Sequence, residues 1–467
     1  MQYSVVNYKT VRENSDFRID AEYFHPSKLN SLRILKNNPI IFLGDYVLSI
    51  KRNETPKDSN IEIYDTGAAS SHILTKNLAQ TEERTSLKRR AKGGDIIISR
   101  LRPYLKQVAY IPTFIDKAYL TTEFFVLRSK DKENISFLTP FLLTEFVQEI
   151  LFWGQGGTQH PRFQEYDLLN LPLTKNIFGL KEILNKIVSK CCKLVLESDH
   201  LYSQAEQFLL SELGLLDWKP KHTLAFVKNY SDTQKAERID AEYFQPKYEE
   251  IIEAVKKYKG GFDELGNLVK INDKNFTPKD NEQYKYIELA NISSNGEING
   301  YTENFGNELP SRARRKVQKG DLVISTIEGS LESIALITED WKNALCSTGF
   351  FVVNSNKLNP ETLLVLLKTK VGQMQLKKGC KGTILTAIDK NELSKIVLPK
   401  IDSKTQEEIK AKITEMYEAK KLSKSLLEIA KRGVEIAIEK DEQEAEEWIE
   451  SEIEKLGVKY AIFGCKL

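Results

Sequence analysis

Residues that build disulfide or metal frameworks are scarce in this chain. Its 467 residues include 5 cysteines and 5 histidines, and no C-x-x-C motif occurs with a matching histidine pair. We therefore expect reduced thiols and no bound metal. No stretch reaches the roughly 18 uninterrupted apolar residues that a membrane span requires, and the first residues lack the apolar core of a signal peptide. These absences predict a cytoplasmic protein.

Catalytic signatures are missing too. The sequence contains no G-x-x-x-x-G-K-[ST], H-E-x-x-H or G-x-S-x-G motif. It has no [ND]-P-P-[YF] tetrapeptide, which an amino-methyltransferase needs to grip a flipped base, and no Pro-Asp dipeptide of the commonest metal-dependent nuclease motif. The glycine run at 154–157 lacks the strand, helix and later acidic residue of a nucleotide site. We expect no catalytic residue and no cofactor in this chain.

What the sequence does contain is a repeat. Residues 18–26 read RIDAEYFHP and residues 238–246 read RIDAEYFQP, so eight of nine positions agree. Residues 94–99 (GDIIIS) and 320–325 (GDLVIS) match in the same order. Further matches are Thr55-Pro56-Lys57-Asp58 with Thr277-Pro278-Lys279-Asp280, and Leu43-Gly44 with Leu265-Gly266. A period this long indicates two duplicated domains rather than a solenoid.

The RIDAEYF segment itself is interpreted as structural. Asp20 and Asp240 suit helix caps, and Arg18 and Glu22 stand within one turn of each other. The Tyr-Phe pair before each proline is expected to contribute to the core.

Short β-rich runs with polar turns fill 40–130 and 262–355, and helical stretches follow at 138–151 and 360–377. The expected strands are 95–101, 107–111 and 124–127, mirrored by 321–327, 333–337 and 350–353. Each repeat then continues into a long helix with apolar residues in 4-3 spacing, as in a coiled coil. In the first helix these are Leu180, Leu184, Ile187, Cys191, Leu194, Leu201, Ala205 and Phe208, with Ser198 as the one gap. In the second they are Ile409, Ile413, Met416, Ala419, Leu422, Leu426, Ile429 or Ala430, and Val434.

These patterns predict an α+β fold with two duplicated mixed α/β domains, separated by two long antiparallel coiled-coil helices and related by a pseudo-two-fold. The predicted segments are a first domain at 1–174, a spacer helix at 175–215, a second domain at 216–401, a second spacer helix at 402–438, and an acidic C-terminal extension at 439–467.

Charge is balanced overall, at a formal +2, but it is not evenly distributed. The segment 439–454 is strongly acidic, so the rest of the chain carries a basic excess. Basic clusters at 88–92 and 312–316 each precede the Gly-Asp strand of their repeat. A single basic cluster is most simply interpreted as a solvated surface loop. Because the clusters recur at matching places in the two repeats, a functional role is favoured.

The loops between the matching strands differ between repeats, with SRLRPYLKQ at 99–107 against STIEGSLES at 325–333. Arginine, glutamine and asparagine can pair with base edges, while lysines and loop amides suit phosphates. This predicts two heads of one fold that contact different DNA sequences. The candidate DNA-binding residues are Arg100, Arg102, Lys106, Thr158, Gln159 and Arg162 in the first repeat, and Lys274, Asn275, Arg312, Arg314, Arg315, Lys381 and Thr383 in the second.

The repeated R-I-D-A-E-Y-F-[HQ]-P, the G-D-[IL]-[IV]-I-S strand, the G-T loop, the closing L-P and the helix after each resemble the specificity (S) subunit of type I restriction–modification systems. The resemblance covers nearly the whole chain. It implies two target recognition domains that each read half of a split double-stranded DNA site, and spacer helices that fix the gap between the halves. It also implies two methyltransferase subunits, which use S-adenosylmethionine, and restriction subunits as partners.

Three alternatives remain open at this point. Related S subunits serve other multi-subunit methylation and phage-defence systems. A protein-only assembly scaffold would bind partners through its helices and bind no DNA. A self-contained methyltransferase or nuclease is disfavoured by the missing motifs.

Overall fold

The chain was analysed as a computed structural model. It describes residues 4–12, 18–37, 39–57, 62–75, 86–221, 223–292, 296–382 and 386–458. Thr383, one of the candidate DNA-binding residues, lies outside these ranges.

The chain forms two compact units. Unit 1 consists of Met1–Glu197 together with Glu418–Leu467, and unit 2 consists of Ser198–Tyr417. The division falls inside both long helices, α8 (Lys181–Glu212) and α15 (Ser403–Glu439). Each unit therefore contains one globular part and a portion of both long helices. The division into five segments with separate spacer helices stays a prediction.

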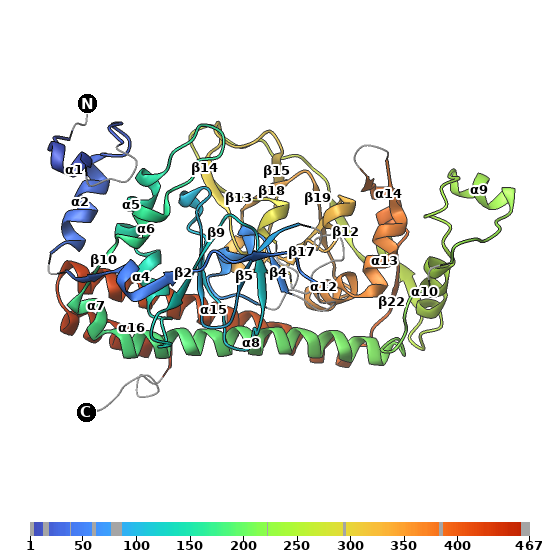
Figure 1. Ribbon diagram of the computed structural model, residues 1–467. Coiled ribbons are helices and arrows are strands. Elements are labelled where there is room, and N and C mark those ends of the chain that lie inside the picture. Colours follow the sequence, from blue (N-terminus) through green and yellow to red (C-terminus); the bar gives the residue numbers. More distant parts are fainter. Residues whose placement is uncertain are drawn as a thin grey trace. The chain divides into compact units, whose positions relative to one another are not determined.

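Unit 1 is built on two four-stranded sheets and a short two-stranded one (Figure 1). The first sheet has the order β2-β9-β6-β7, the second β3-β5-β8-β4, and β1 pairs with β10. The strands are β1 Pro39–Phe42, β2 Val47–Ser49, β3 Asn53–Glu54, β4 Glu62–Tyr64, β5 Lys88–Ala91, β6 Ile96–Ser99, β7 Val108–Tyr110, β8 Ala118–Leu120, β9 Phe124–Ser129 and β10 Pro172–Thr174. Because β6 is buried along its whole length, it reads as a continuous apolar run and was recognisable from the sequence.

Unit 2 repeats the first sheet of unit 1 and three of the four strands of the second, while the fourth strand of that sheet lies at the opposite edge. Its first sheet has the order β12-β19-β16-β17, its second β14-β13-β18-β15, and β11 pairs with β22, while β20 and β21 form a further pair. The strands are β11 Phe262–Glu264, β12 Lys270–Asn272, β13 Gln283–Ile287, β14 Thr302–Phe305, β15 Ala313–Lys316, β16 Leu322–Ser325, β17 Ile334–Leu336, β18 Leu345–Ser347, β19 Phe350–Asn354, β20 Cys380–Lys381, β21 Ala387–Ile388 and β22 Val397–Pro399. A parallel pair recurs as well in the second sheet of each unit, β4 with β8 and β13 with β18. The prediction of duplicated α+β domains is confirmed.

Six helices occupy equivalent places in the described parts of the two units, and unit 1 also has one at Lys175–Gly179. In unit 1 they are α1 Tyr8–Arg12, α2 Pro26–Leu35, α3 Leu43–Tyr46, α4 Leu138–Leu143, α5 Glu145–Gly154, α6 Glu165–Leu169 and α7 Lys175–Gly179. In unit 2 they are α9 Tyr230–Ala236, α10 Pro246–Lys256, α11 Leu265–Leu268, α12 Pro360–Lys368, α13 Lys370–Gly379 and α14 Lys390–Ser394. Each helical stretch expected after the sheet is in fact two helices, because Thr144 and Thr369 interrupt it in extended conformation.

The long helices run antiparallel within each unit. In unit 1, Asn176 just before α8 donates to the carbonyl of Ala437, whereas Cys191 and Ser423 exchange hydrogen bonds further along. In unit 2, Lys412 donates to Gln204 at 3.2 Å. Ser198, the gap in the predicted apolar seam, is fully buried in unit 2. The predicted seams are confirmed, with Leu201, Phe208 and Leu422 only partly buried.

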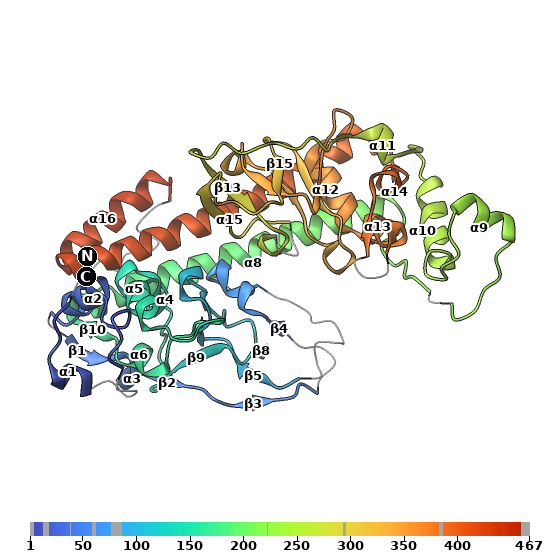
Figure 2. The ribbon, with the colours of Figure 1, turned by 90° about the horizontal axis from the view of Figure 1, so that it is seen from above.

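The acidic extension contains one more helix, α16 (Glu442–Lys455), capped by Asp441. It lies beside α15 within unit 1 (Figure 2). Ala445, Ile449 and Ile453 are fully buried in the unit 1 core, and a side chain at Gly433 of α15 would collide with Ile449. Despite its acidic composition, this helix therefore packs against unit 1 through a narrow apolar stripe.

Candidate nucleic-acid interface

The RIDAEYF segment forms the same clamp in both units. Arg18 pairs with Asp20 and donates to the carbonyls of Gly154 and Gln155 at 2.9 and 3.0 Å. In unit 2, Arg238 pairs with Asp240 and donates to the carbonyls of Lys378 and Cys380 at 3.3 and 2.8 Å. These carbonyls lie where α5 and α13 end and the glycine-bearing loops begin. Arginine satisfies acceptors that a helix end leaves unpaired, so the motif fixes the start of each loop.

Two details of the expected motif are corrected. Asp20 and Asp240 cap a turn, each accepting from the backbone N–H three residues on, and the helices begin only at Pro26 and Pro246. Proline favours the first helical position because it lacks the N–H that would go unsatisfied there. The partner of Arg18 is Asp20 rather than Glu22. Tyr23, Phe24 and Phe244 are buried as expected, whereas Tyr243 is only partly buried.

In unit 1 the backbone joins the two predicted reading loops. The N–H of Arg102 donates to the carbonyl of Pro161 at 3.1 Å, and the N–H of Phe163 to that of Arg100 at 3.2 Å. Arg162 forms bridge pairs with both Leu101 and Gly156. The segments 100–106 and 155–163 therefore form one surface. This arrangement is needed if both segments are to contact the same half of a DNA site, as the sequence predicts.

The candidate residues on this surface divide into two groups. Arg102, Lys106, Thr158 and Gln159 are exposed. Arg100 and Arg162 instead share the carboxylate of Glu123, with Arg100 Nε at 3.1 Å and the Arg162 terminal nitrogen at 2.7 Å from its oxygens. Arg162 also donates to the carbonyl of His160 at 2.9 Å. Arg162 is thus placed to hold the loop, and Glu123 is a component that sequence reasoning missed.

Glu123 makes a pH-dependent contribution to stability. Its pKa is lowered to about 2, chiefly by the hydrogen bond from Arg162, with Arg100 adding to the effect. Since the unfolded carboxyl titrates near its ordinary value of 4.5, the contribution is complete above pH 4.5 and is lost as pH falls through about 2. We expect Glu123→Gln to lower the free energy of unfolding by about 1 kcal/mol at pH 7, after allowance for solvent screening. Urea unfolding at pH 7 and pH 2.5 should show this difference shrinking, and an equal difference at both values would contradict the assignment.

Basic strand residues border the loops in both units. Arg89 of β5 and Arg315 of β15 are equivalent, since each lies opposite the same position of the neighbouring strand, Leu120 in β8 and Cys346 in β18. Burial, followed by the charge of Arg100, lowers the pKa of Arg89, and Glu165 opposes this. Arg89 is therefore within electrostatic reach of the unit 1 loop surface.

The same place in each unit holds an ion pair with its charges exchanged. In unit 1, Lys51 pairs with Glu165, the first residue of α6, at 2.6 Å. In unit 2, Asp273 pairs with Lys390, the first residue of α14, also at 2.6 Å. Both pairs join the segment after the first strand of a four-stranded sheet to the helix that follows the glycine-bearing loop.

The exchanged charges of the two ion pairs allow the pair in unit 1 to be tested by a charge-swapped double variant. We expect Lys51→Asp or Glu165→Lys alone to lower stability by less than about 1 kcal/mol, because the pair is partly exposed. The double variant Lys51→Asp/Glu165→Lys recreates the unit 2 arrangement and should recover wild-type stability in a thermal-unfolding double-mutant cycle. A double variant as unstable as the sum of the single variants would show that the pair makes no direct interaction.

Unit 2 gathers most of its candidates around Asp273. Arg315 donates to the Asp273 carbonyl, and Lys274 and Asn275 follow directly and are exposed. The carbonyl of Arg314 accepts from the N–H of Phe276 at 2.7 Å. Lys381 pairs with Asp389 at 2.5 Å, beside the Lys390 that holds Asp273. Arg312, also exposed, precedes β15 and its carbonyl accepts from Thr348 at 2.9 Å, so it extends the surface along β15.

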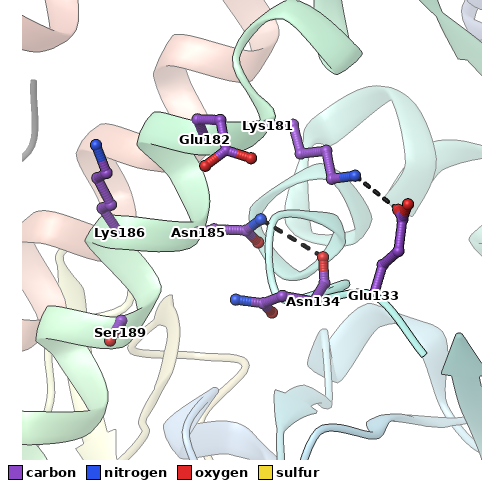
Figure 3. A pocket seen from close by; sticks show the side chains of 7 residues that line it. All are labelled: Glu133, Asn134, Lys181, Glu182, Asn185, Lys186 and Ser189. Atoms are coloured by element: carbon purple, nitrogen blue, oxygen red, sulfur yellow. Dashed lines mark hydrogen bonds and ion pairs between the residues drawn. The ribbon is translucent and has the colours of Figure 1, made fainter. Parts of the chain in front are cut away.

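A shallow pocket of unit 1 has a structural role (Figure 3). It is lined by residues at 133–134 and within 181–189, and none of them is a candidate DNA-binding residue. Glu133 accepts from Lys181 at 2.7 Å and from the hydroxyl of Tyr46 at 2.8 Å. Asn185 of α8 accepts from the N–H of Phe137 and from Ser136. Its lining residues thus tether the segment before α4 to the long helix.

No cluster of His, Cys, Asp or Glu that could hold a metal is present in the described residues. Among the helices that the structure describes, none is long and apolar enough to span a membrane. Cys191, Cys192, Cys346 and Cys380 are free thiols, and burial raises the pKa of both Cys191 and Cys192 to about 12. Such thiols are poor nucleophiles.

Comparison with known proteins gives likenesses only at the level of solved structures. No protein-family model matches the chain, and no curated protein matches it in sequence. One similar chain comes from a type I R-M system solved for its complex assembly and conformational transition, with 18% identity, TM-score 0.27, and coverage of 90% of this chain and 97% of that one. A second is the HsdS subunit from Thermoanaerobacter tengcongensis, with 16% identity, TM-score 0.30, and coverage of 86% and 96%. A third is the type I restriction–modification S subunit from M. genitalium, with 14% identity, TM-score 0.30, and coverage of 91% and 98%.

Proposed function

We propose that this chain is a non-catalytic DNA-recognition subunit that reads a split double-stranded site, one half with each unit. It directs methyltransferase and restriction subunits to that site, and the methyltransferase supplies the S-adenosylmethionine chemistry. Such a subunit acts in the cytoplasm, where the DNA is.

The observation that carries this proposal is one strand frame, alike in all but one edge strand, used twice with different exposed side chains in the loops. The strand frame and the RIDAEYF clamp agree between the units, whereas the loops do not. The exposed candidates of unit 1 are Arg102, Lys106, Thr158 and Gln159, and those of unit 2 are Lys274, Asn275, Arg312 and Lys381. Side chains of these types serve base edges and phosphates, and a frame that holds unlike loops suits two different half-sites.

Methylome sequencing of a host with and without the gene tests the proposal directly. A bipartite methylated motif should vanish when the gene is removed. Gel shifts of the purified chain, alone and with its methyltransferase, should show duplex affinity falling steeply between 50 and 200 mM salt. An unchanged methylome together with no salt-dependent DNA binding would favour a protein-only scaffold.

Substitution of single exposed arginines or lysines tests the division between units. We expect Arg102→Ala to weaken binding by about 1–3 kcal/mol and to relax sequence preference in one half of the site only. Lys274→Ala is the corresponding test in unit 2. It should weaken binding and relax sequence preference in the other half of the site. Selection from a random duplex pool reports both halves at once, and loss of preference in both halves from either substitution would contradict separate reading.

A further inference from the structure

The tip of one unit 1 loop presents apolar side chains to solvent within a basic setting. Tyr104 and Leu105 are 55% and 45% exposed, and they stand between Arg102 and Lys106, which are also exposed. Because the two apolar side chains are adjacent in the chain and exposed together, they form a small apolar patch with a polar rim, which is typical of a contact surface. The flanking cations favour a polyanionic partner over a neutral protein surface.

This tip is held in an unfavourable backbone conformation. Arg102 and Lys106 have φ values of 51° and 50°, a left-handed region that side chains other than glycine, asparagine and aspartate rarely adopt. Non-glycine residues persist there only where their surroundings enforce it, and such residues cluster at functional sites.

The enforcing contacts are present. The N–H of Leu105 donates to the carbonyl of Arg102 at 3.0 Å, and the N–H of Lys106 to that of Pro103 at 2.8 Å. Pro103 is buried, and the N–H of Arg102 is bound to Pro161 of the adjoining loop. Tyr104 and Leu105 are therefore presented on a fixed turn, which reduces the entropy lost when they bind.

Unit 2 lacks this device at the equivalent loop. Its residues Glu328-Gly329-Ser330-Leu331-Glu332 align with Arg102-Pro103-Tyr104-Leu105-Lys106, between matching strands. Leu331 is only 6% exposed, and the Ser330 hydroxyl bonds to Ser325 at 2.9 Å. The two flanking carboxylates would repel phosphates.

We infer that Tyr104 and Leu105 form an apolar wedge that enters the base stack of the half-site bound by unit 1, while Arg102 contacts a neighbouring base edge and Lys106 holds an adjacent phosphate. Side chains of this kind part base steps and kink the duplex, and aromatic rings stack on the exposed base. The wedge acts on one half-site only, because the unit 2 loop is acidic and its leucine is buried. This inference rests on the proposed DNA-recognition function.

The test uses the full chain and the duplex that it enriches from a random pool. 2-Aminopurine is placed in turn at each step of the half-site whose selection Arg102→Ala relaxes. We expect fluorescence to rise at one step on binding. Tyr104→Ala should abolish that rise and weaken binding about tenfold, whereas Tyr104→Phe should preserve both. Tyr230→Ala, which removes an exposed tyrosine of α9, serves as the matched control and should change neither.

The outcomes separate the two proposals. If no duplex is enriched at any salt concentration, both fall. If a duplex is enriched and Tyr104→Ala leaves affinity and fluorescence unchanged, only the wedge is overturned. Loss of methyltransferase co-purification in Tyr104→Ala, with DNA binding intact, would also overturn it and make the tip a protein contact.

Discussion

Replacing Asp167 by alanine is expected to destabilise unit 1 by about 3–5 kcal/mol, because it leaves a buried lysine without its carboxylate. Lys28 is 3% exposed and its Nζ lies 3.0 Å from Asp167 Oδ1. Tyr23 of the RIDAEYF segment donates its hydroxyl to the same oxygen at 2.8 Å, and Lys28 Nζ lies 3.3 Å from the centre of its ring. Burial lowers the pKa of Lys28 although Asp167 opposes the shift, so the pair is held at a desolvation cost.

The structure offers a matched control in unit 2. Glu392 is the third residue of α14, as Asp167 is of α6, and it pairs with the exposed Lys395. Glu392→Ala should cost less than about 1 kcal/mol. The double variant Lys28→Met/Asp167→Asn removes both charges and should recover most of the lost stability. Hydrogen exchange of the β6 and β9 amides measures the effect in unit 1, and that of the β16 and β19 amides measures it in unit 2. Equal losses from Asp167→Ala and Glu392→Ala would contradict the account.

Ile449→Ala is expected to cost about 2–5 kcal/mol, since it empties a fully buried site between α16 and α15. Gly433→Ala should also release α16, because the added methyl group would occupy the place of the Ile449 side chain. Glu450→Ala, on the exposed side of the same helix, should change stability by less than about 0.5 kcal/mol. Limited proteolysis between α15 and α16 reports release of the helix, and unchanged cleavage of Ile449→Ala would refute the docking.

Much of the scaffold was predictable because its signals are local or repeated. The apolar runs at 95–101 and 321–327 became β6 and β16, and the 4-3 spacing of the long helices became buried seams. The role of α16 was missed because acidic residues dominate its composition. Its signal was present in the spacing of Ala445, Ile449 and Ile453, which recur every four residues.

The site was harder to predict because its key contacts join distant residues. Arg100 and Arg162 are residue types that can bind base edges. No local sequence pattern predicts that both would form ion pairs with Glu123. The ion pairs Lys51–Glu165 and Asp273–Lys390 cannot be found by looking for identical residues in the two repeats. The repeats keep opposite charges at these two positions but exchange which residue carries each charge. Exposed candidates such as Arg102 and Lys274 could be named from type and place alone.

The division of the chain also bears on how it is made. Unit 2 is one continuous segment, Ser198–Tyr417, whereas unit 1 requires Glu418–Leu467 in addition to its N-terminal part. During synthesis the N-terminal sheets leave the ribosome first, yet the helix pair that buries Leu184 and Ile187 against Leu426 and Ala430 needs residues made more than 200 positions later. The second domain is therefore the first that can complete its fold, and the first domain keeps part of its core uncovered until residues 418–453 have been made.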